Sequence, residues 1–239
     1  LVHDPAIPSI PGLCFFDASG TYQDGGMAET APEALTNQLW NENPFRDWQR
    51  PFVQLETTRG CPHRCAFCTS SLDTGLRQLH ADQIIAALDP VQAHNINEVR
   101  VLDRTFNAIP DHALACLSLF KQRYPDIRFH LEIHPGFLTE PLREAIAAYP
   151  SDKLHIEVGL QSTHPDVLSA CNRTRHDASI DGLQFLCSLP NTIVHVDLLA
   201  GLPHLTPQIL VDDVRKLAAL QPHEIQLETL KILPGTPIA

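Results

Sequence analysis

Hydrophobic and polar positions follow different patterns before and after about residue 50. Before residue 50, Pro and Gly residues interrupt any helical or strand-like repeat of hydrophobic positions. Only residues 12–22 form a regular pattern there, which predicts a small hairpin turning at Ala18-Ser19-Gly20. From residue 51, short apolar runs alternate with longer segments of helical period. We therefore expect an N-terminal extension and connector over residues 1–50 and one folded domain over residues 51–239.

Six strands are predicted in the second part, with a helix in each interval between them. The strands cover residues 52–58, 98–103, 128–134, 153–159, 192–199 and 224–231. The helices cover residues 80–88, 111–124, 139–149, 177–189 and 207–220. Intervals of about 25 to 45 residues fit crossover connections and hence a parallel sheet. Six units are too few for the closed eight-stranded barrel, so the predicted fold is α/β, a partial (βα)6 parallel-stranded barrel with an N-terminal hairpin extension.

The later strands are apolar on one side only, which is unusual for strands of a parallel sheet. In residues 128–134, for example, Leu131 and Ile133 alternate with polar residues. The polar positions of these strands are His130, Glu132, His134, His155, Glu157, His195, Asp197, Gln226 and Glu228. Because unpaired charges are costly to bury, we expect this face to line a wet cavity or a polar ligand. The alternative is an antiparallel sheet with one face in water, which the long helical connections disfavour.

Composition and charge limit the kind of protein this is. The 239 residues carry 17 Lys and Arg against 28 Asp and Glu, a net charge of −11, which disfavours a nucleic-acid partner. No stretch approaches the roughly 20 apolar residues of a membrane span. The N-terminal residues lack the basic region and apolar run of a secretory signal. The chain does not begin with Met, so we expect it to be processed or cut from a longer protein.

Three of the seven cysteines lie close together in the sequence. Cys61, Cys65 and Cys68 follow the first predicted strand in a segment rich in Gly, Pro, Thr and Ser, which predicts a loop. Loops at that end of a parallel sheet are where α/β proteins place ligands. The odd number of cysteines disfavours a secreted disulfide framework. We therefore expect a cytoplasmic protein in which these three thiols bind a metal, while four others are mostly core thiols: Cys14, Cys116, Cys171 and Cys187.

Two kinds of metal centre are candidates for this motif. A structural zinc ion needs four ligands, and His63 is the candidate fourth ligand, although it lies inside the motif. An iron–sulfur cubane is held by thiolates, and with three of them one iron stays open for a substrate or cofactor. The number and softness of the ligands favour the cluster. Arg59, just before the motif, and Arg64, within it, are expected to offset the negative charge of the cluster.

The spacing Cys61-x3-Cys65-x2-Cys68, with Phe67 before the third cysteine, resembles the radical S-adenosylmethionine (radical SAM) superfamily. Later segments resemble its branch containing oxygen-independent coproporphyrinogen oxidase, namely Gly159-Leu-Gln-Ser162, Cys171-Asn-Arg-Thr174, Asp197-Leu-Leu-Ala-Gly-Leu-Pro203 and Leu233-Pro-Gly-Thr-Pro237. In that family the open iron binds SAM, and an electron from the cluster cleaves the sulfonium. The resulting 5′-deoxyadenosyl radical abstracts hydrogen from a substrate. The resemblance thus implies a [4Fe-4S] cluster on the three cysteines with SAM beside it.

The resemblance also implies which residues contact SAM. They are Glu132 and Gln161, with Arg173 and Asp197 beside them. After the second strand, Asp103-Arg-Thr-Phe-Asn107 replaces the Gly-Gly-rich element of that branch and resembles the branch fused to a cobalamin-binding domain. Within it, Asp103 is expected to accept the methionyl amine and Thr105 to contact SAM. Ile10-Pro-Gly-Leu13 and the hairpin resemble the connector that follows a cobalamin domain.

Several alternatives and partners remain open at this stage. The cobalamin signature Asp-x-His-x-x-Gly is absent, so one alternative is a cobalamin-dependent methyltransferase whose cobalamin domain lies outside this chain. Another is a non-catalytic module clipped by zinc. The resemblance implies an electron donor of the flavodoxin or ferredoxin type, and the substrate is an unidentified small molecule or peptide.

The remaining cysteines, two histidines and one charged segment have less specific patterns. Cys116, Cys171 and Cys187 are too irregularly spaced to predict an auxiliary cluster. His134 is expected either to line the site or to be structural, and His204 to lie in a solvated loop. The charged residues of Asp212-Asp-Val-Arg-Lys216 are expected on the solvated face of a helix.

Overall fold

The computed structural model describes residues 11–26, 50–72 and 75–239. The chain divides into two compact units, residues 1–36 and 37–239. In the first unit, the predicted hairpin consists of the antiparallel strands β1 (Cys14–Phe16) and β2 (Tyr22–Asp24). The Asp17 carboxylate closes the turn by accepting hydrogen bonds from the backbone amides of Ser19 and Thr21. Residues 1–10 and 27–49 of the expected N-terminal extension and connector lie outside the described residues, so its boundary stays a prediction.

Six parallel strands form the sheet of the second unit, in the order β10-β9-β8-β7-β6-β3. They are β3 (Val53–Leu55), β6 (Glu98–Val101), β7 (Arg128–Ile133), β8 (Leu154–Gln161), β9 (Thr192–Ala200) and β10 (Glu224–Thr229). Every pairing between them is parallel. Among the described strands, β3 and β10 are the unpaired ends of this sheet. The predicted partial barrel of six parallel strands is therefore confirmed, and the antiparallel alternative is wrong.

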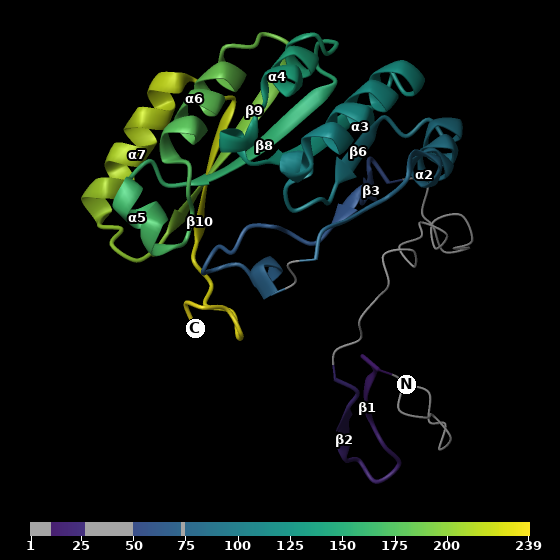
Figure 1. Cartoon of the computed structure of the whole chain (residues 1–239), viewed down its shortest axis with the longest axis vertical. Helices are drawn as coiled ribbons and strands as arrows, with labels where there is room; N and C mark the ends of the chain where they lie inside the picture. The colour runs from purple at the N-terminus through teal and green to yellow at the C-terminus, as the bar shows by residue number, and fades with distance from the viewer. Residues whose placement is uncertain (1–10, 27–49, 73–74) are drawn as a thin grey trace. The chain divides into compact units, whose positions relative to one another are not determined.

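Helices run along one face of the curved sheet (Figure 1). The five predicted helices are present as α2 (Ala81–Ala93), α3 (Pro110–Arg123), α4 (Glu140–Ala147), α6 (His176–Cys187) and α7 (Pro207–Leu220). The short α5 (Pro165–Ala170) was not predicted, because six residues are too few to display a helical period. In the part of the chain that the structure describes, three 3₁₀ turns lie in the connections: η2 (Thr69–Leu72), η3 (Phe106–Ala108) and η4 (Pro135–Phe137).

The core lies between the helices and the apolar face of the sheet. Val99, Ile156 and Val196 are fully buried there, one on each of three strands. Between α3 and β7, the rings of Phe120 and Phe129 stack with their centroids 4.0 Å apart. None of the described helices combines the length and the apolar character that crossing a membrane requires.

The opposite face of the sheet carries the predicted polar positions in rows across neighbouring strands. Glu132 of β7 lies beside Glu157 of β8, which in turn lies beside His195 of β9. One step toward the amino ends of the strands, His130 lies beside His155, and their ring centroids are 4.5 Å apart. The parallel register therefore gathers imidazoles and carboxylates on the concave face of the sheet.

Candidate metal centre and cofactor cavity

The three motif cysteines line one cavity at the carboxyl end of the sheet. They stand in the loop between β4 (Thr58–Arg59) and β5 (Arg77–Gln78), two short antiparallel strands. The cavity has a volume of about 180 Å³, and Cys61 and Cys65 are each 7% exposed. Gly60 allows the loop to form, because its φ is +94° and an added Cβ would lie 2.0 Å from the carbonyl oxygen of Gly75.

A distant turn holds the middle of this loop. The Cys171 carbonyl accepts a hydrogen bond from the backbone amide of Ala66 at 3.0 Å, and the side-chain amide of Asn172 donates to the Arg64 carbonyl at 2.8 Å. The next residue, Arg173, donates from Nη1 to the Sγ of Cys65 at 3.3 Å. Cys171, Asn172 and Arg173, the three residues after α5, therefore hold the cysteine loop in place.

Five of the six predicted cofactor contacts line the same cavity as the cysteines: Thr105, Glu132, Gln161, Arg173 and Asp197. The Thr105 hydroxyl lies 3.8 Å from the Sγ of Cys61. Gln161 ends β8 with a φ of +77°, a left-handed conformation that is uncommon for a non-glycine residue. Thr105, Glu132 and Gln161 lie at or just after the carboxyl ends of parallel strands, Asp197 lies within β9, and Arg173 comes from the turn after α5.

Asp103 is the predicted contact that the structure places elsewhere. It is fully buried and does not line the cavity. Its carboxylate accepts hydrogen bonds from the backbone amides of Thr57 and Thr58, at 2.7 and 2.9 Å, and from the Thr57 hydroxyl. Both carboxylate oxygens are therefore engaged in anchoring the chain just before the cysteine loop. Burial raises the pKa of Asp103, and the hydrogen bonds from Thr57 and Thr58 oppose that rise.

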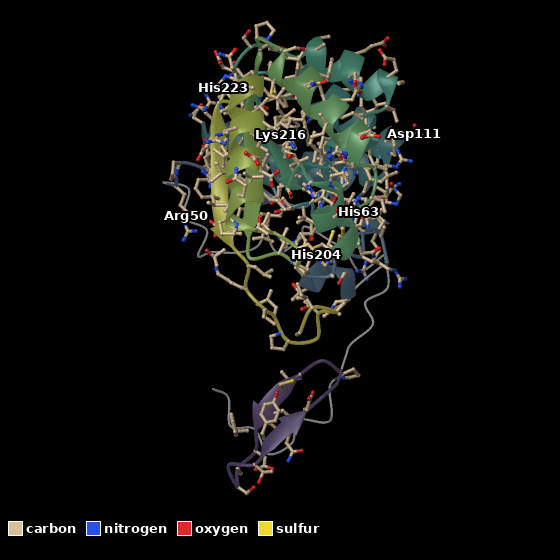
Figure 2. The ribbon with its side chains drawn as sticks, turned by 90° about the vertical axis from the view of Figure 1, so that its left-hand side faces the viewer. Arg50, His63, Asp111, His204, Lys216 and His223 are labelled. Atoms are coloured by element: carbon tan, nitrogen blue, oxygen red, sulfur yellow. The ribbon has the colours of Figure 1, made fainter. Side chains whose placement is uncertain are left out.

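Two histidines form part of the wall beside Cys65. His63 and His134 line the cavity, and their ring centroids are 4.9 Å apart, with Phe137 in contact with both. Burial, with a further contribution from the Arg173 charge, lowers the pKa of His134 to about 3. His134 is therefore a neutral imidazole that lines the site, one of its two expected placements. His204, by contrast, is exposed near the same end of the sheet (Figure 2).

A chain of ionisable groups leads from the cavity into the concave face. Glu157 lines the cavity, and its Oε2 lies 2.9 Å from Nε2 of His130, a hydrogen bond that lowers the pKa of Glu157. Burial and the nearby Glu157 charge raise the pKa of Asp197 to about 8. Nε2 of His195 lies 3.1 Å from Oδ1 of Asp197, yet neither atom forms a hydrogen bond with the described residues. The opposite pKa shifts of Glu157 and Asp197 therefore favour a proton on Asp197 rather than on Glu157.

The thiol arrangement distinguishes between the two candidate metals. Within the described residues, no group of three or more His, Cys, Asp or Glu is placed to hold a single metal ion. A structural zinc requires such convergence on one point. A cubane takes each thiolate at a different iron, so its three sulfurs stand apart around a common space. Three thiols around one cavity, with polar groups on its other walls, therefore fit the cluster better than zinc.

Of the other four cysteines, the three in the second unit do not line this cavity. Cys116 is buried with its Sγ 3.5 Å from Nε2 of His112, and Cys171 is buried against Val167. Cys187 is half-buried, whereas Cys14 is exposed in the hairpin, so the expectation of core thiols is wrong for Cys14.

One buried carboxylate was misassigned from the sequence. Asp213 was expected on a solvated helix face, but it is 1% exposed. It accepts hydrogen bonds from the hydroxyls of Ser162 and Thr163, at 2.7 and 2.5 Å, and from the Thr163 amide at 2.9 Å. It thus fixes the turn that follows Gln161. The signal was available, because position 213 lies four residues from both Ile209 and Leu217 on the apolar stripe of α7.

Comparison with protein families and curated sequences gives a consistent set of relatives. The family model described as the Radical SAM superfamily matches residues 55–217. The ribosomal protein uS12 methylthiotransferase RimO of Synechocystis sp. is 27% identical over 169 residues, which cover 66% of this chain and 38% of that protein. RimO of Prochlorococcus marinus is 26% identical over 219 residues, covering 82% of this chain and 50% of that protein. The chain thus spans half or less of the length of these relatives.

Solved structures share the fold at lower identity. The methyltransferase TsrM of Kitasatospora setae, solved with cobalamin and a [4Fe-4S] cluster, has a TM-score of 0.69 and 22% identity, covering 78% of this chain and 38% of TsrM. Coproporphyrinogen III oxidase (HemN) of Escherichia coli has a TM-score of 0.57 and 18% identity, covering 81% of this chain and 47% of HemN.

Proposed function

The chain belongs to the radical SAM superfamily, and on that premise we propose that it binds a [4Fe-4S] cluster through Cys61, Cys65 and Cys68 and cleaves SAM reductively. The observation that carries this proposal is the placement of all three thiols around one cavity together with five of the expected SAM contacts. When bound, the cluster supplies the electron that breaks the sulfonium bond and releases a 5′-deoxyadenosyl radical for hydrogen abstraction. The protein's own task is to hold, orient and shield these groups.

The charges of the cavity suggest how SAM is oriented. SAM carries an ammonium group, a carboxylate and a sulfonium. Glu132, which lines the cavity at the end of β7, is the proposed partner of the ammonium group. Arg104 and Arg173 are the cations on the cavity wall and the proposed partners of the SAM carboxylate. Gln161 and Thr105 offer neutral hydrogen-bonding groups in the same space. We assign Asp103 a positioning role, because both of its carboxylate oxygens are engaged by Thr57 and Thr58.

A second candidate function is transfer of a methyl or methylthio group. It is favoured by the curated relatives, which are methylthiotransferases acting on ribosomal protein uS12. Cobalamin is proposed only for this second candidate function. It would require a cobalamin-binding domain encoded outside the sequence of this chain. The substrate in either case is a small molecule or a peptide. A zinc-clipped module is disfavoured, because the described residues hold no group converging on a single ion.

Reduction of the cluster requires a partner. We propose an electron donor of the flavodoxin or ferredoxin type and a cytoplasmic location. All seven cysteines are free thiols in the structure, which fits a reducing compartment.

The proposal is tested by anaerobic reconstitution with iron and sulfide. The expected result is a brown protein with acid-labile sulfide that forms 5′-deoxyadenosine from SAM and dithionite. Cys65→Ala is expected to abolish both, whereas Cys187→Ala, which removes a thiol outside the cavity, retains them. Zinc bound at one per chain without sulfide would overturn the proposal, and a cluster without 5′-deoxyadenosine would overturn its catalytic part. Product analysis with candidate peptides distinguishes methylthio transfer from other outcomes.

A further inference from the structure

A second hollow lies on the outer side of the cavity wall. It has a volume of about 200 Å³ and is lined by Pro62, His63, Arg64, Cys65, His134, Asn172, Arg173 and Thr174. Four of these residues also line the cofactor cavity: His63, Cys65, His134 and Arg173. The two spaces therefore share these four side chains as a common boundary. A molecule bound in the outer hollow therefore reaches the Cys65 side of the metal centre without entering the cofactor cavity.

The outer hollow differs from the rest of the molecule in its charge. The chain has a net charge of −11, yet the hollow is lined by two arginines and by no carboxylate. Arg64 is exposed and forms no ion pair with any residue in the described part of the chain. The side chains of Pro62, Asn172 and Thr174 at the same hollow are exposed as well. A local positive surface on an acidic protein favours an acidic partner over a basic or neutral one.

We propose that this hollow, around Arg64 and the Asn172-Arg173-Thr174 turn, is the docking site of an acidic one-electron carrier protein that reduces the metal centre. This rests on the proposed function, because it requires a cluster on Cys65. In the docked complex one electron passes from the reduced prosthetic group of the carrier to the cluster. The carrier is oxidised by one electron and the cluster is reduced by one, and no bond forms or breaks in that step. SAM keeps its own access through the cavity on the other side of the wall.

Hydrogen bonds hold the backbone around the hollow in place. Asn172 bonds the Arg64 carbonyl, and Arg173 bonds both Cys65 and the Gly159 carbonyl. The rings of His63, His134 and Phe137 fill the wall behind it. The Arg64 side chain is the free element at the rim, and its charge acts by steering the encounter, an effect that salt screens.

The experiment compares two reductants on the reconstituted protein. The rate of cluster reduction is followed by loss of visible absorbance, with photoreduced flavodoxin as the protein donor and dithionite as the small one. Arg64→Glu is expected to lower the ratio of the flavodoxin rate to the dithionite rate about tenfold at low salt, because an effect of this charge on the cluster itself would change both rates. Thr174→Glu, which adds an acidic side chain without touching the cysteine loop, is expected to act in the same direction. Added salt should slow the reduction of the wild-type protein by flavodoxin, and it should not slow the reduction of Arg64→Glu.

Arg215→Glu is the matched control, because Arg215 is an exposed arginine on α7 outside the hollow. Equal flavodoxin rates in wild type, Arg64→Glu and Thr174→Glu would overturn the docking proposal while leaving the cluster intact. If no cluster assembles, the proposed function fails instead. Binding of oxidised flavodoxin to the metal-free chain then tests the surface alone, and equal dissociation constants for wild type and Arg64→Glu would overturn it.

Discussion

The guanidinium of Arg173 bridges the cysteine loop and the end of β8. Its Nη1 donates a hydrogen bond to the Sγ of Cys65 at 3.3 Å, and its Nη2 donates to the carbonyl oxygen of Gly159. Hydrogen bonds and positive charge at a ligating sulfur stabilise the reduced state of an iron–sulfur cluster. Arg173 therefore links the position of the loop to the electronic properties of the metal centre.

Arg173→Ala is accordingly expected to lower the reduction potential of the reconstituted cluster. The measurement is a redox titration of the cluster followed by its electron paramagnetic resonance signal. Arg175→Ala serves as the control, because Arg175 lies two residues away and contacts the Gly136 carbonyl and the Phe137 ring instead of a cysteine. Equal potentials in all three proteins would show that the Arg173 contact does not act on the cluster.

A second prediction concerns Asp213, which holds the turn after Gln161 through three hydrogen bonds. Asp213→Ala leaves the buried hydroxyls of Ser162 and Thr163 and the Thr163 amide without their acceptor. We expect the free energy of unfolding to fall by about 3 kcal/mol, measured by chemical denaturation. The neighbouring Asp212 is 47% exposed and forms a surface ion pair. Asp212→Ala is therefore expected to change the free energy of unfolding by about 0.5 kcal/mol or less. Similar losses in the two variants would contradict the buried role of Asp213.

The two buried carboxylates show where sequence reasoning reached its limit. The cysteine loop and the alternating strands were predictable, because their signals lie within a few neighbouring residues. Asp103 binds Thr57, which is 46 residues away in the sequence. Asp213 binds Ser162 and Thr163, which are 51 and 50 residues away. The roles of both carboxylates therefore depend on which strands and helices lie side by side. The family resemblance assigned Asp103 to the cofactor. Asp213 was expected on the solvated face of α7 together with its neighbour Asp212, although position 213 faces the core. Tertiary packing decides both assignments.

Asp197 gives a prediction about pH. Its folded-state pKa of about 8 lies above the ordinary value of 3.8. Between those values the folded protein keeps the proton, whereas the unfolded chain has lost it. The contribution of Asp197 to the free energy of unfolding therefore falls as pH rises through this window, by at most about 1.4 kcal/mol per pH unit. Asp197→Asn cannot ionise, so we expect its stability relative to wild type to increase between pH 5 and pH 7.5.

Denaturation curves of the two proteins at several pH values provide the measurement. Glu144→Gln is the control, since Glu144 is an exposed carboxylate on α4 that does not line the cavity. Its stability relative to wild type is expected to stay constant over the same range. A constant difference for Asp197→Asn as well would mean that Asp197 is ionised in the folded protein, contrary to its place beside Glu157.

The last prediction concerns the glycine before the first motif cysteine. Gly60 has a φ of +94°, and an added Cβ would lie 2.0 Å from the Gly75 carbonyl oxygen. Gly201 has nearly the same φ, +92°, but its added Cβ would meet Leu230 at an ordinary 3.5 Å. Both alanine variants therefore bear the strain of a left-handed alanine, about 1–2 kcal/mol, and Gly60→Ala alone must also shift backbone at the cysteine loop.

Iron and sulfide content after reconstitution separates these two effects. Gly60→Ala is expected to bind much less iron than wild type, because the displaced backbone moves Cys61 relative to Cys65 and Cys68. Gly201→Ala is expected to lose stability in chemical denaturation while retaining its iron, since its backbone has room for the methyl group. Equal iron content in both variants would show that the cysteine loop tolerates displacement at Gly60, and the tight approach of Gly75 would then have no part in forming the metal centre.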